Sequence, residues 1–196
     1  MTKQITLTIG IPAHNEEANI KNLLANLLRQ KTNGFELKEI IVYSDGSTDQ
    51  TISQAKLVLD SKIKVIDSKN RQGKNTTQNK IFKRASSDIL LIMDADILPE
   101  NINFLNSMVN VFIQNEDASL VAAKVLPVFG GSLVSEVLAH SQNLKLLLSE
   151  KIAKIKPIYI CNGRAMAYSN KLYKNLEIPE KLLADDAYSC LVCIQK

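Results

Sequence analysis

The sequence contains no tryptophan, only three cysteines, and few glycines and prolines. An odd number of cysteines cannot complete a disulfide framework, which excludes a small disulfide-stabilised secreted scaffold. Seven glycines and five prolines in 196 residues exclude a collagen-like chain. No apolar run reaches about 18 residues, the length that predicts a membrane-spanning helix. What remains is a globular chain, long enough to fold around its own hydrophobic core.

Charge and length narrow the possibilities further. The net charge of +4, from 24 basic and 20 acidic residues, is too small to indicate nucleic-acid binding, so no nucleic-acid partner is expected. The length predicts a single domain over residues 1–196. Residues 1–8 alternate polar and apolar side chains, unlike the continuous apolar run of a signal peptide. We therefore expect the protein in the cytoplasm or at the cytoplasmic face of a membrane.

The first two thirds of the chain alternate strand patterns with helix patterns. Runs of apolar and β-branched residues predict strands at residues 5–11, 39–44, 62–67, 89–93 and 119–128. Helices are expected to begin at an Asn15 cap, near residues 47–49, at residue 74, and with Pro99 in a first turn. This alternation predicts an α/β fold with a mostly parallel sheet flanked by helices, and loops at its carboxyl edge that share one crevice.

The last third of the chain has weaker strand signals. Residues 132–156 predict one long helix whose apolar stripe packs in the core while its lysines face solvent. The alternative is that this helix lies on an anionic membrane or against a partner. A short strand is expected over residues 158–161, a loop and strand over 163–169, and a final helix opening at 182–186. Cys190 and Cys193 lie in an apolar run and are expected in the core.

Two motifs that follow apolar strands carry candidate chemistry, and each has a structural alternative. Asp94-Ala95-Asp96 follows an apolar strand, where residues i and i+2 face the same side, so a cation such as Mg²⁺ or Mn²⁺ would relieve the repulsion between carboxylates. The alternative is a turn with two solvated aspartates. Asp45 also follows an apolar strand and is either a ligand acceptor or part of a helix-capping turn with Gly46.

Two motifs begin helices. Gly73-Lys74 opens a helix in a basic stretch and can receive phosphate, although no second glycine makes it a P-loop. Asp185-Asp186 opens the last helix and supplies either a general base or simple capping of that helix. The sequence has no dinucleotide-binding G-x-G-x-x-G and no G-x-S-x-G nucleophile elbow.

Taken in order, these segments resemble the family 2 glycosyltransferases, which have the GT-A fold and use nucleotide-diphosphate sugars. The motifs are residues 11–17 (IPAHNEE), 44–49 (SDGSTD), 73–74 (GK), 94–96 (DAD) and 185–186 (DD). The resemblance implies a GT-A, Rossmann-like sheet with a smaller C-terminal part. Residues 1–128 would form the nucleotide-sugar-binding half and residues 129–196 the acceptor-side half.

The resemblance also implies how the donor is bound. Pro12, Ala13 and His14 would line the nucleobase and ribose with Glu17 nearby, and His14 stands where the family usually has tyrosine. Asp45 would accept a hydrogen bond from uracil, which makes UDP the expected nucleotide. The remaining implied donor contacts are Lys74 at the diphosphate, Asp94 and Ala95 at the ribose or sugar, and Asp96, with Asp94, at the metal ion.

On the acceptor side, Gly163, Arg164 and Asp185 would form the wall of the sugar and acceptor site. Asp186 would deprotonate the acceptor hydroxyl, which attacks the anomeric carbon from the face opposite the leaving group, so that the configuration is inverted. The transition state is expected to resemble an oxocarbenium ion. The acceptor would be a saccharide, a lipid-linked molecule or another hydroxyl compound. Peripheral membrane association is the alternative to core packing of the long helix.

The chain departs from the family at its end. Family members commonly carry Gln-x-x-Arg-Trp after the acidic pair, and this sequence has no tryptophan. The leading hypothesis is the glycosyltransferase, and the missing motif is the reason for an alternative, a GT-A-like module that binds nucleotide sugar with little or no turnover. A sugar nucleotidyltransferase ranks last, because that class would need a glycine-rich basic loop after the first strand, where residues 12–17 are acidic instead.

Overall fold

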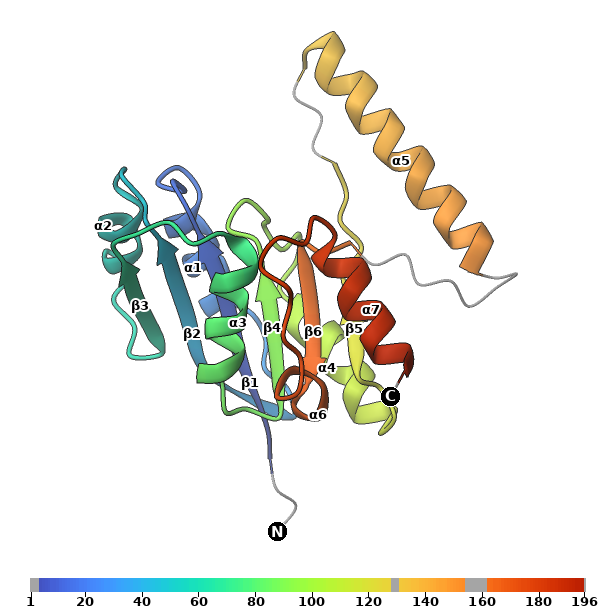
Figure 1. The fold of residues 1–196 in the computed structure, drawn as a ribbon, viewed down its shortest axis with the longest axis horizontal. Helices are drawn as coiled ribbons and strands as arrows, with labels where there is room; N and C mark the ends of the chain where they lie inside the picture. The colour runs from blue at the N-terminus through green and yellow to red at the C-terminus, as the bar shows by residue number, and fades with distance from the viewer. Residues whose placement is uncertain (1–3, 128–130, 154–161, 196) are drawn as a thin grey trace.

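The computed structural model of the chain describes residues 4–127, 131–153 and 162–195, in which six strands form one sheet with helices on both faces (Figure 1). The strands are β1 (Ile5–Ala13), β2 (Phe35–Asp45), β3 (Ile63–Ser68), β4 (Ile89–Met93), β5 (Leu120–Ala122) and β6 (Ala165–Ser169). Their order in the sheet is β3-β2-β1-β4-β6-β5. β1 to β4 pair in parallel, whereas β6 is antiparallel to both β4 and β5. The predicted α/β fold with a mostly parallel sheet is confirmed.

Two hydrophobic clusters hold the helices against the sheet. The helices are α1 (Ile20–Leu28), α2 (Thr51–Lys56), α3 (Lys74–Arg84), α4 (Phe104–Gln114), α5 (Leu133–Ala153), α6 (Asn170–Tyr173) and α7 (Asp185–Gln195). Because side chains alternate along a strand, β4 sends Ile89, Leu91 and Met93 to one face and Leu90 and Ile92 to the other. The first face is covered by α1, α2 and α4, and the second by α3, α6 and α7.

The position of α3 depends on a glycine in β1. A Cβ atom built on Gly10 would lie 2.4 Å from Cγ2 of Ile81, far inside van der Waals contact. Any larger residue at position 10 would therefore push α3 away from the sheet. The first residue of α3, Lys74, lies at the carboxyl edge of the sheet.

Two predicted helix starts are wrong. Asn15 is not a helix cap: it has a left-handed backbone with φ of 56°, and its side-chain oxygen accepts a hydrogen bond from the backbone N–H of Thr48 at 2.9 Å. α1 begins five residues later, at Ile20. Pro99 likewise precedes α4, which begins at Phe104. Both residues belong to loops that are held by contacts distant in sequence, and these contacts outweigh the local capping signal.

The predicted strand over residues 119–128 is shorter in the structure, where β5 spans only Leu120–Ala122. The strand predicted within residues 163–169 is β6, and α6 follows it directly at Asn170.

The predicted long helix is confirmed as α5, but its expected core packing is wrong. Seven of its side chains are 50% to 79% exposed: Leu133, Val134, Val137, Leu138, Leu144, Leu147 and Leu148. In Figure 1, α5 stands apart from the sheet. The strand expected over residues 158–161 lies outside the described residues. Cys190 is buried and Cys193 packs against the same cluster, as predicted.

Candidate active site

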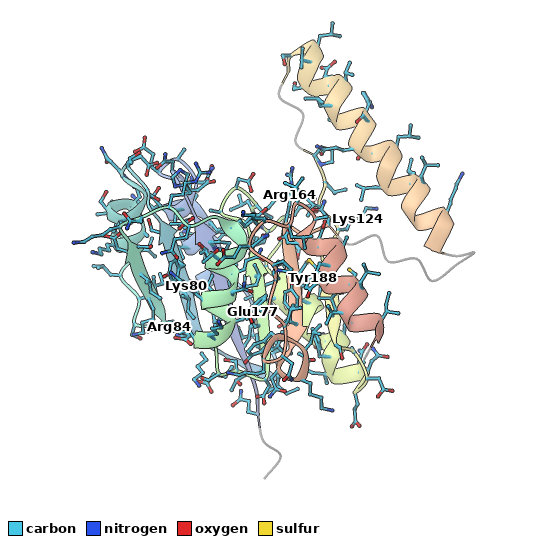
Figure 2. The ribbon with its side chains drawn as sticks, in the orientation of Figure 1. Lys80, Arg84, Lys124, Arg164, Glu177 and Tyr188 are labelled. Carbon is cyan, nitrogen blue, oxygen red and sulfur yellow. The ribbon has the colours of Figure 1, made fainter. Side chains whose placement is uncertain are left out.

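The carboxyl edge of the sheet collects the motifs from both halves of the chain. β1, β2 and β4 end at this edge, and the antiparallel β6 begins there. Met93 pairs with Ala165, and the backbone N–H of Asp94 donates a 2.8 Å hydrogen bond to the carbonyl of Arg164. Gly163 and Arg164 therefore adjoin the Asp94–Asp96 loop. Figure 2 shows Arg164 at this edge beside Lys124, which follows β5.

The loop after β1 is tied to the loop after β2. Nδ1 of His14 lies 2.8 Å from the backbone carbonyl oxygen of Asp45. Because a carbonyl oxygen only accepts, Nδ1 is the donor of this hydrogen bond and carries a proton. Glu17, which is exposed, accepts a 2.8 Å hydrogen bond from the backbone of Gln50. Pro12 is partly exposed and Ala13 is buried at the end of β1. The structure thus brings these residues together at one site, and their contacts with a nucleotide stay predictions.

Asp45 organises the loop that leads into α3. Its side chain is buried, and its two carboxylate oxygens accept hydrogen bonds from the backbone N–H groups of Gln72 and Gly73, each at 2.8 Å. These bonds hold the loop immediately before Lys74. Sequence reasoning identified Asp45 as a ligand acceptor or a turn residue and missed this contact, because the partners lie 27 and 28 residues away.

Lys74 lies between two carboxylates. Its ammonium nitrogen is 2.8 Å from a carboxylate oxygen of Asp94 and 3.9 Å from one of Asp185. Burial raises the pKa of Asp94 above its usual value, the positive charge of Lys74 opposes this shift, and the negative charges of Asp96 and Asp185 add to it. The lysine predicted for the diphosphate thus joins the acidic motif after β4 to the acidic pair of α7.

The two aspartates of the Asp94–Asp96 loop do not share a strand face. β4 ends at Met93, so both lie in the turn that follows, with Asp94 partly buried and Asp96 exposed. The strand geometry behind the predicted metal pair is therefore wrong, although both carboxylates remain at the same edge. Within residues 4–127, 131–153 and 162–195, no cluster of three or more His, Cys, Asp or Glu side chains could hold a metal ion. The carboxylate oxygens suit Mg²⁺ or Mn²⁺ only if other oxygen ligands complete the coordination.

The acidic pair opens α7 and reaches back to the β6 loop. Asp186 accepts a hydrogen bond from the backbone N–H of Gly163 at 3.2 Å. A Cβ atom added to Gly163 would lie 2.9 Å from Cβ of Asp186, so only glycine allows this approach. Asp185 accepts a 3.1 Å hydrogen bond from the side chain of Gln78. The structure therefore places Asp186 beside Gly163 and Asp185 beside Lys74.

Sequence reasoning missed a row of amide side chains on α3. Asn75, Gln78 and Asn79 are buried although they are polar, and they contact the segment that leads into α7. A polar helix normally faces solvent, so composition gave no reason to expect burial here. The available signal was their spacing of i, i+3 and i+4, which places them on one side of the helix.

Comparisons with known proteins agree on the family. The sequence model described as "Glycosyl transferase family 2" matches residues 8–176. The poly-beta-1,6-N-acetyl-D-glucosamine synthase of Staphylococcus aureus is 32% identical over 93 residues, which are 47% of this chain and 22% of that protein. The chain thus matches only about a fifth of the length of this curated relative.

Solved structures with the same fold are longer than this chain. The mannosyltransferase PcManGT from Pyrobaculum calidifontis, in complex with GDP-Man and Mn²⁺, superposes with a TM-score of 0.76 and 22% identity, covering 98% of this chain and 52% of that one. Residues 1–349 of TarS from S. aureus, in complex with UDP-GlcNAc, give a TM-score of 0.67 and 20% identity, covering 96% and 53%. These likenesses confirm the expected GT-A fold.

Proposed function

The chain belongs to glycosyl transferase family 2, and on this basis we propose that it transfers a sugar from a nucleotide-diphosphate sugar to an acceptor hydroxyl. The observation that carries the proposal is the contact of Lys74 with both Asp94 and Asp185. In the proposed reaction, this cation contacts the diphosphate leaving group close to the acidic pair that activates the acceptor. Neither motif alone would indicate group transfer.

The proposed reaction is a single displacement with inversion. Asp186 takes the proton of the acceptor hydroxyl, whose oxygen forms a bond to the anomeric carbon. The bond from that carbon to the diphosphate oxygen breaks, and the nucleoside diphosphate leaves with the electron pair. The positive charge of Lys74 stabilises the negative charge that develops on the leaving group. Gly163, Arg164 and Asp185 line the space in which sugar and acceptor meet.

A divalent metal ion fits this site as a partner of the donor. Asp96, with Asp94, would hold Mg²⁺ or Mn²⁺, whose remaining ligands would come from the diphosphate and water. When bound, such an ion neutralises the charge on a leaving phosphate. The GDP-Man and Mn²⁺ complex of PcManGT supports the use of a divalent ion. Asp94 already has Lys74 as a partner, so Asp96 is the freely exposed ligand.

UDP is the proposed nucleotide. The UDP-GlcNAc complex of TarS supports this choice, and GDP is the competing candidate because PcManGT binds GDP-Man. The likeness to a poly-N-acetylglucosamine synthase supports a role in making a cell-envelope polysaccharide. The acceptor would then be a saccharide or a lipid-linked molecule.

Peripheral membrane association at the cytoplasmic face is part of the proposal. Among the described residues, no helix is both long and apolar enough to cross a membrane. The exposed leucines and valines of α5 nevertheless form an apolar surface, which a peripheral helix could bury at the lipid interface. The single-domain organisation over residues 1–196 remains a prediction.

Release of nucleoside diphosphate tests the proposed activity. The protein is incubated with UDP-glucose, UDP-GlcNAc or GDP-mannose and Mn²⁺, with water serving as a slow acceptor. We expect release from one donor and a decrease of at least about 100-fold in Asp186→Asn, because the general base is lost. Full release by Asp186→Asn would remove Asp186 from the mechanism. Nucleotide binding without any release would favour the binding-module alternative.

A further inference from the structure

Helix α3 presents three buried amide side chains to the segment that carries the acidic pair. The side-chain N–H₂ of Asn79 donates to the carbonyl of Ile178 at 2.8 Å, and its oxygen accepts from the N–H of Ile178 at 2.9 Å. The N–H₂ of Asn75 faces the carbonyl oxygens of Pro179, Glu180 and Leu182 at 2.9, 3.3 and 2.8 Å. Together these bonds fix the backbone of residues 178–182 against α3.

Gln78 continues this row to Asp185 itself. Its Nε2 donates to a carboxylate oxygen of Asp185 at 3.1 Å. Its other polar atom, Oε1, is buried and has no hydrogen-bond partner among the residues that the structure describes. A buried acceptor without a partner lowers stability, so an apolar residue of the same size would suit this position better if packing were its purpose. The functional group of the Gln78 side chain is therefore its N–H₂, which donates a hydrogen bond to Asp185.

The arrangement matters because Asp185 has a second partner that the donor substrate would take away. Lys74 lies 3.9 Å from the same oxygen of Asp185, and under the proposed function it turns to the diphosphate. Asp185 would then lose its neighbouring cation at the moment when the acidic pair must be in place. Gln78 carries no charge and is not attracted to the diphosphate, so it keeps its hydrogen bond throughout.

We propose that Gln78 is a positioning residue, which holds Asp185, and through it the adjacent Asp186, against the donor half of the site. Asn75 and Asn79 support it by fixing the segment before α7. This inference rests on the proposed function for its effect on turnover. The structural part, that the amide row orders the start of α7, can be measured independently of any activity.

The test compares Gln78→Met with a control on the same helix. Methionine has a similar volume, and because Oε1 has no partner, the substitution removes only the bond to Asp185. Lys83→Ala is the matched control: Lys83 contacts Glu177 of the same approaching segment at 3.4 Å, but both side chains are about three-quarters exposed, at 72% and 75%. An exposed ion pair of this kind contributes little to order.

Two readouts are measured on each protein: hydrogen–deuterium exchange in peptides covering residues 178–190, and donor hydrolysis with UDP-GlcNAc, UDP-glucose or GDP-mannose and Mn²⁺. For Gln78→Met we expect faster hydrogen–deuterium exchange at the start of α7 and an unchanged KM for the donor. We expect kcat to be about 10-fold lower, because a displaced base is poorly aligned. Lys83→Ala should match the wild type in both.

Exchange and kcat equal to the wild type in Gln78→Met would overturn the inference, as would equal effects in Lys83→Ala. If the wild type hydrolyses no donor, the proposed function fails, while the exchange comparison still decides whether Gln78 orders α7. Asn75→Asp is the second variant, in case Gln78→Met is unstable. It keeps the side-chain shape but replaces the donor with an acceptor that repels three carbonyl oxygens, and faster exchange over residues 178–184 is expected.

Discussion

The ammonium nitrogen of Lys74 lies 2.8 Å from a carboxylate oxygen of Asp94, and this ion pair joins the first turn of α3 to the loop after β4. Asp94 is the less exposed partner, at 23% against 40% for Lys74. The protein thus already holds a cation at the place where the proposed donor brings its diphosphate. Donor binding would exchange one anionic partner of Lys74 for another rather than bury a new charge.

Asp94→Asn is expected to leave stability at neutral pH unchanged or to raise it. Burial raises the pKa of Asp94 above 3.8 despite the opposing effect of Lys74. Because its pKa is higher in the folded state, protonation of Asp94 stabilises the folded protein. This contribution is complete below the unfolded-state pKa and is lost as pH rises through the folded-state pKa. Urea unfolding at about pH 4 and about pH 7.5 should therefore show a smaller loss of stability with rising pH in the variant than in the wild type.

The control for this measurement is Asp117→Asn, an exposed aspartate in the turn after α4. It should not change the pH dependence. A marked loss of stability in Asp94→Asn at neutral pH would mean that the ion pair with Lys74 outweighs the cost of burial, contrary to the direction of the pKa shift.

Asp45→Asn should loosen the loop before α3 even without nucleotide. An amide can accept only one of the two backbone hydrogen bonds that Asp45 now accepts from Gln72 and Gly73. We expect a loss of about 2 kcal/mol of stability and faster hydrogen exchange over residues 70–76. Asp67→Asn, at an exposed position on β3, is the control. Unchanged exchange in Asp45→Asn would leave nucleobase binding as the only role for this carboxylate.

Gly163→Ala should reduce turnover without weakening nucleotide binding. The added Cβ would lie 2.9 Å from Cβ of Asp186 and would displace the proposed base. We expect kcat to fall about 10-fold, with the nucleotide Kd unchanged. If the effect acts through Asp186, adding Gly163→Ala to Asp186→Asn should cost nothing further. Independent, multiplying losses in the double variant would show that Gly163 acts in another way.

The apolar surface of α5 predicts binding to lipid vesicles. Leu144 and Leu148 are 58% and 50% exposed, so replacing both with serine should not disturb the sheet. Co-sedimentation with vesicles containing anionic lipid should decrease in this variant, because less apolar surface enters the interface. Leu59→Ser, at a position that is 94% exposed between α2 and β3, should have no effect. If the wild-type protein co-sediments with vesicles of no composition, membrane binding by α5 is excluded.

Sequence patterns were sufficient to predict the elements whose burial follows from the spacing of their own apolar residues. β4 was predicted at its exact bounds because five consecutive apolar residues are buried on both faces of the sheet. The apolar face of α1 was equally clear, since Ile20, Leu23, Leu24 and Leu27 are buried at helical spacing. The motif order also brought the correct loops to one edge, because parallel strands end together.

Other features depend on partners that a local pattern does not contain. The direction of β6 is set by its pairing with β4, and this pairing is what carries Gly163 and Arg164 to Asp94. Asn15 resembles a helix cap in sequence, but in the structure its side-chain oxygen accepts a hydrogen bond from the backbone N–H of Thr48. The buried amides of α3 resemble a solvated face, and the apolar stripe of α5 resembles a core face, because composition alone does not identify the neighbour.

A thermal-shift titration with UDP, GDP and CDP, each with and without Mn²⁺, tests the central claim most directly. A ligand that binds only the folded protein stabilises it by about 2.7 kcal/mol at 100 times its Kd. We expect a metal-dependent increase in Tm with UDP, a smaller increase or none with GDP and CDP, and loss of the increase in Asp96→Ala. No shift with any nucleotide, or a shift that Asp96→Ala retains in full, would contradict the proposed donor site.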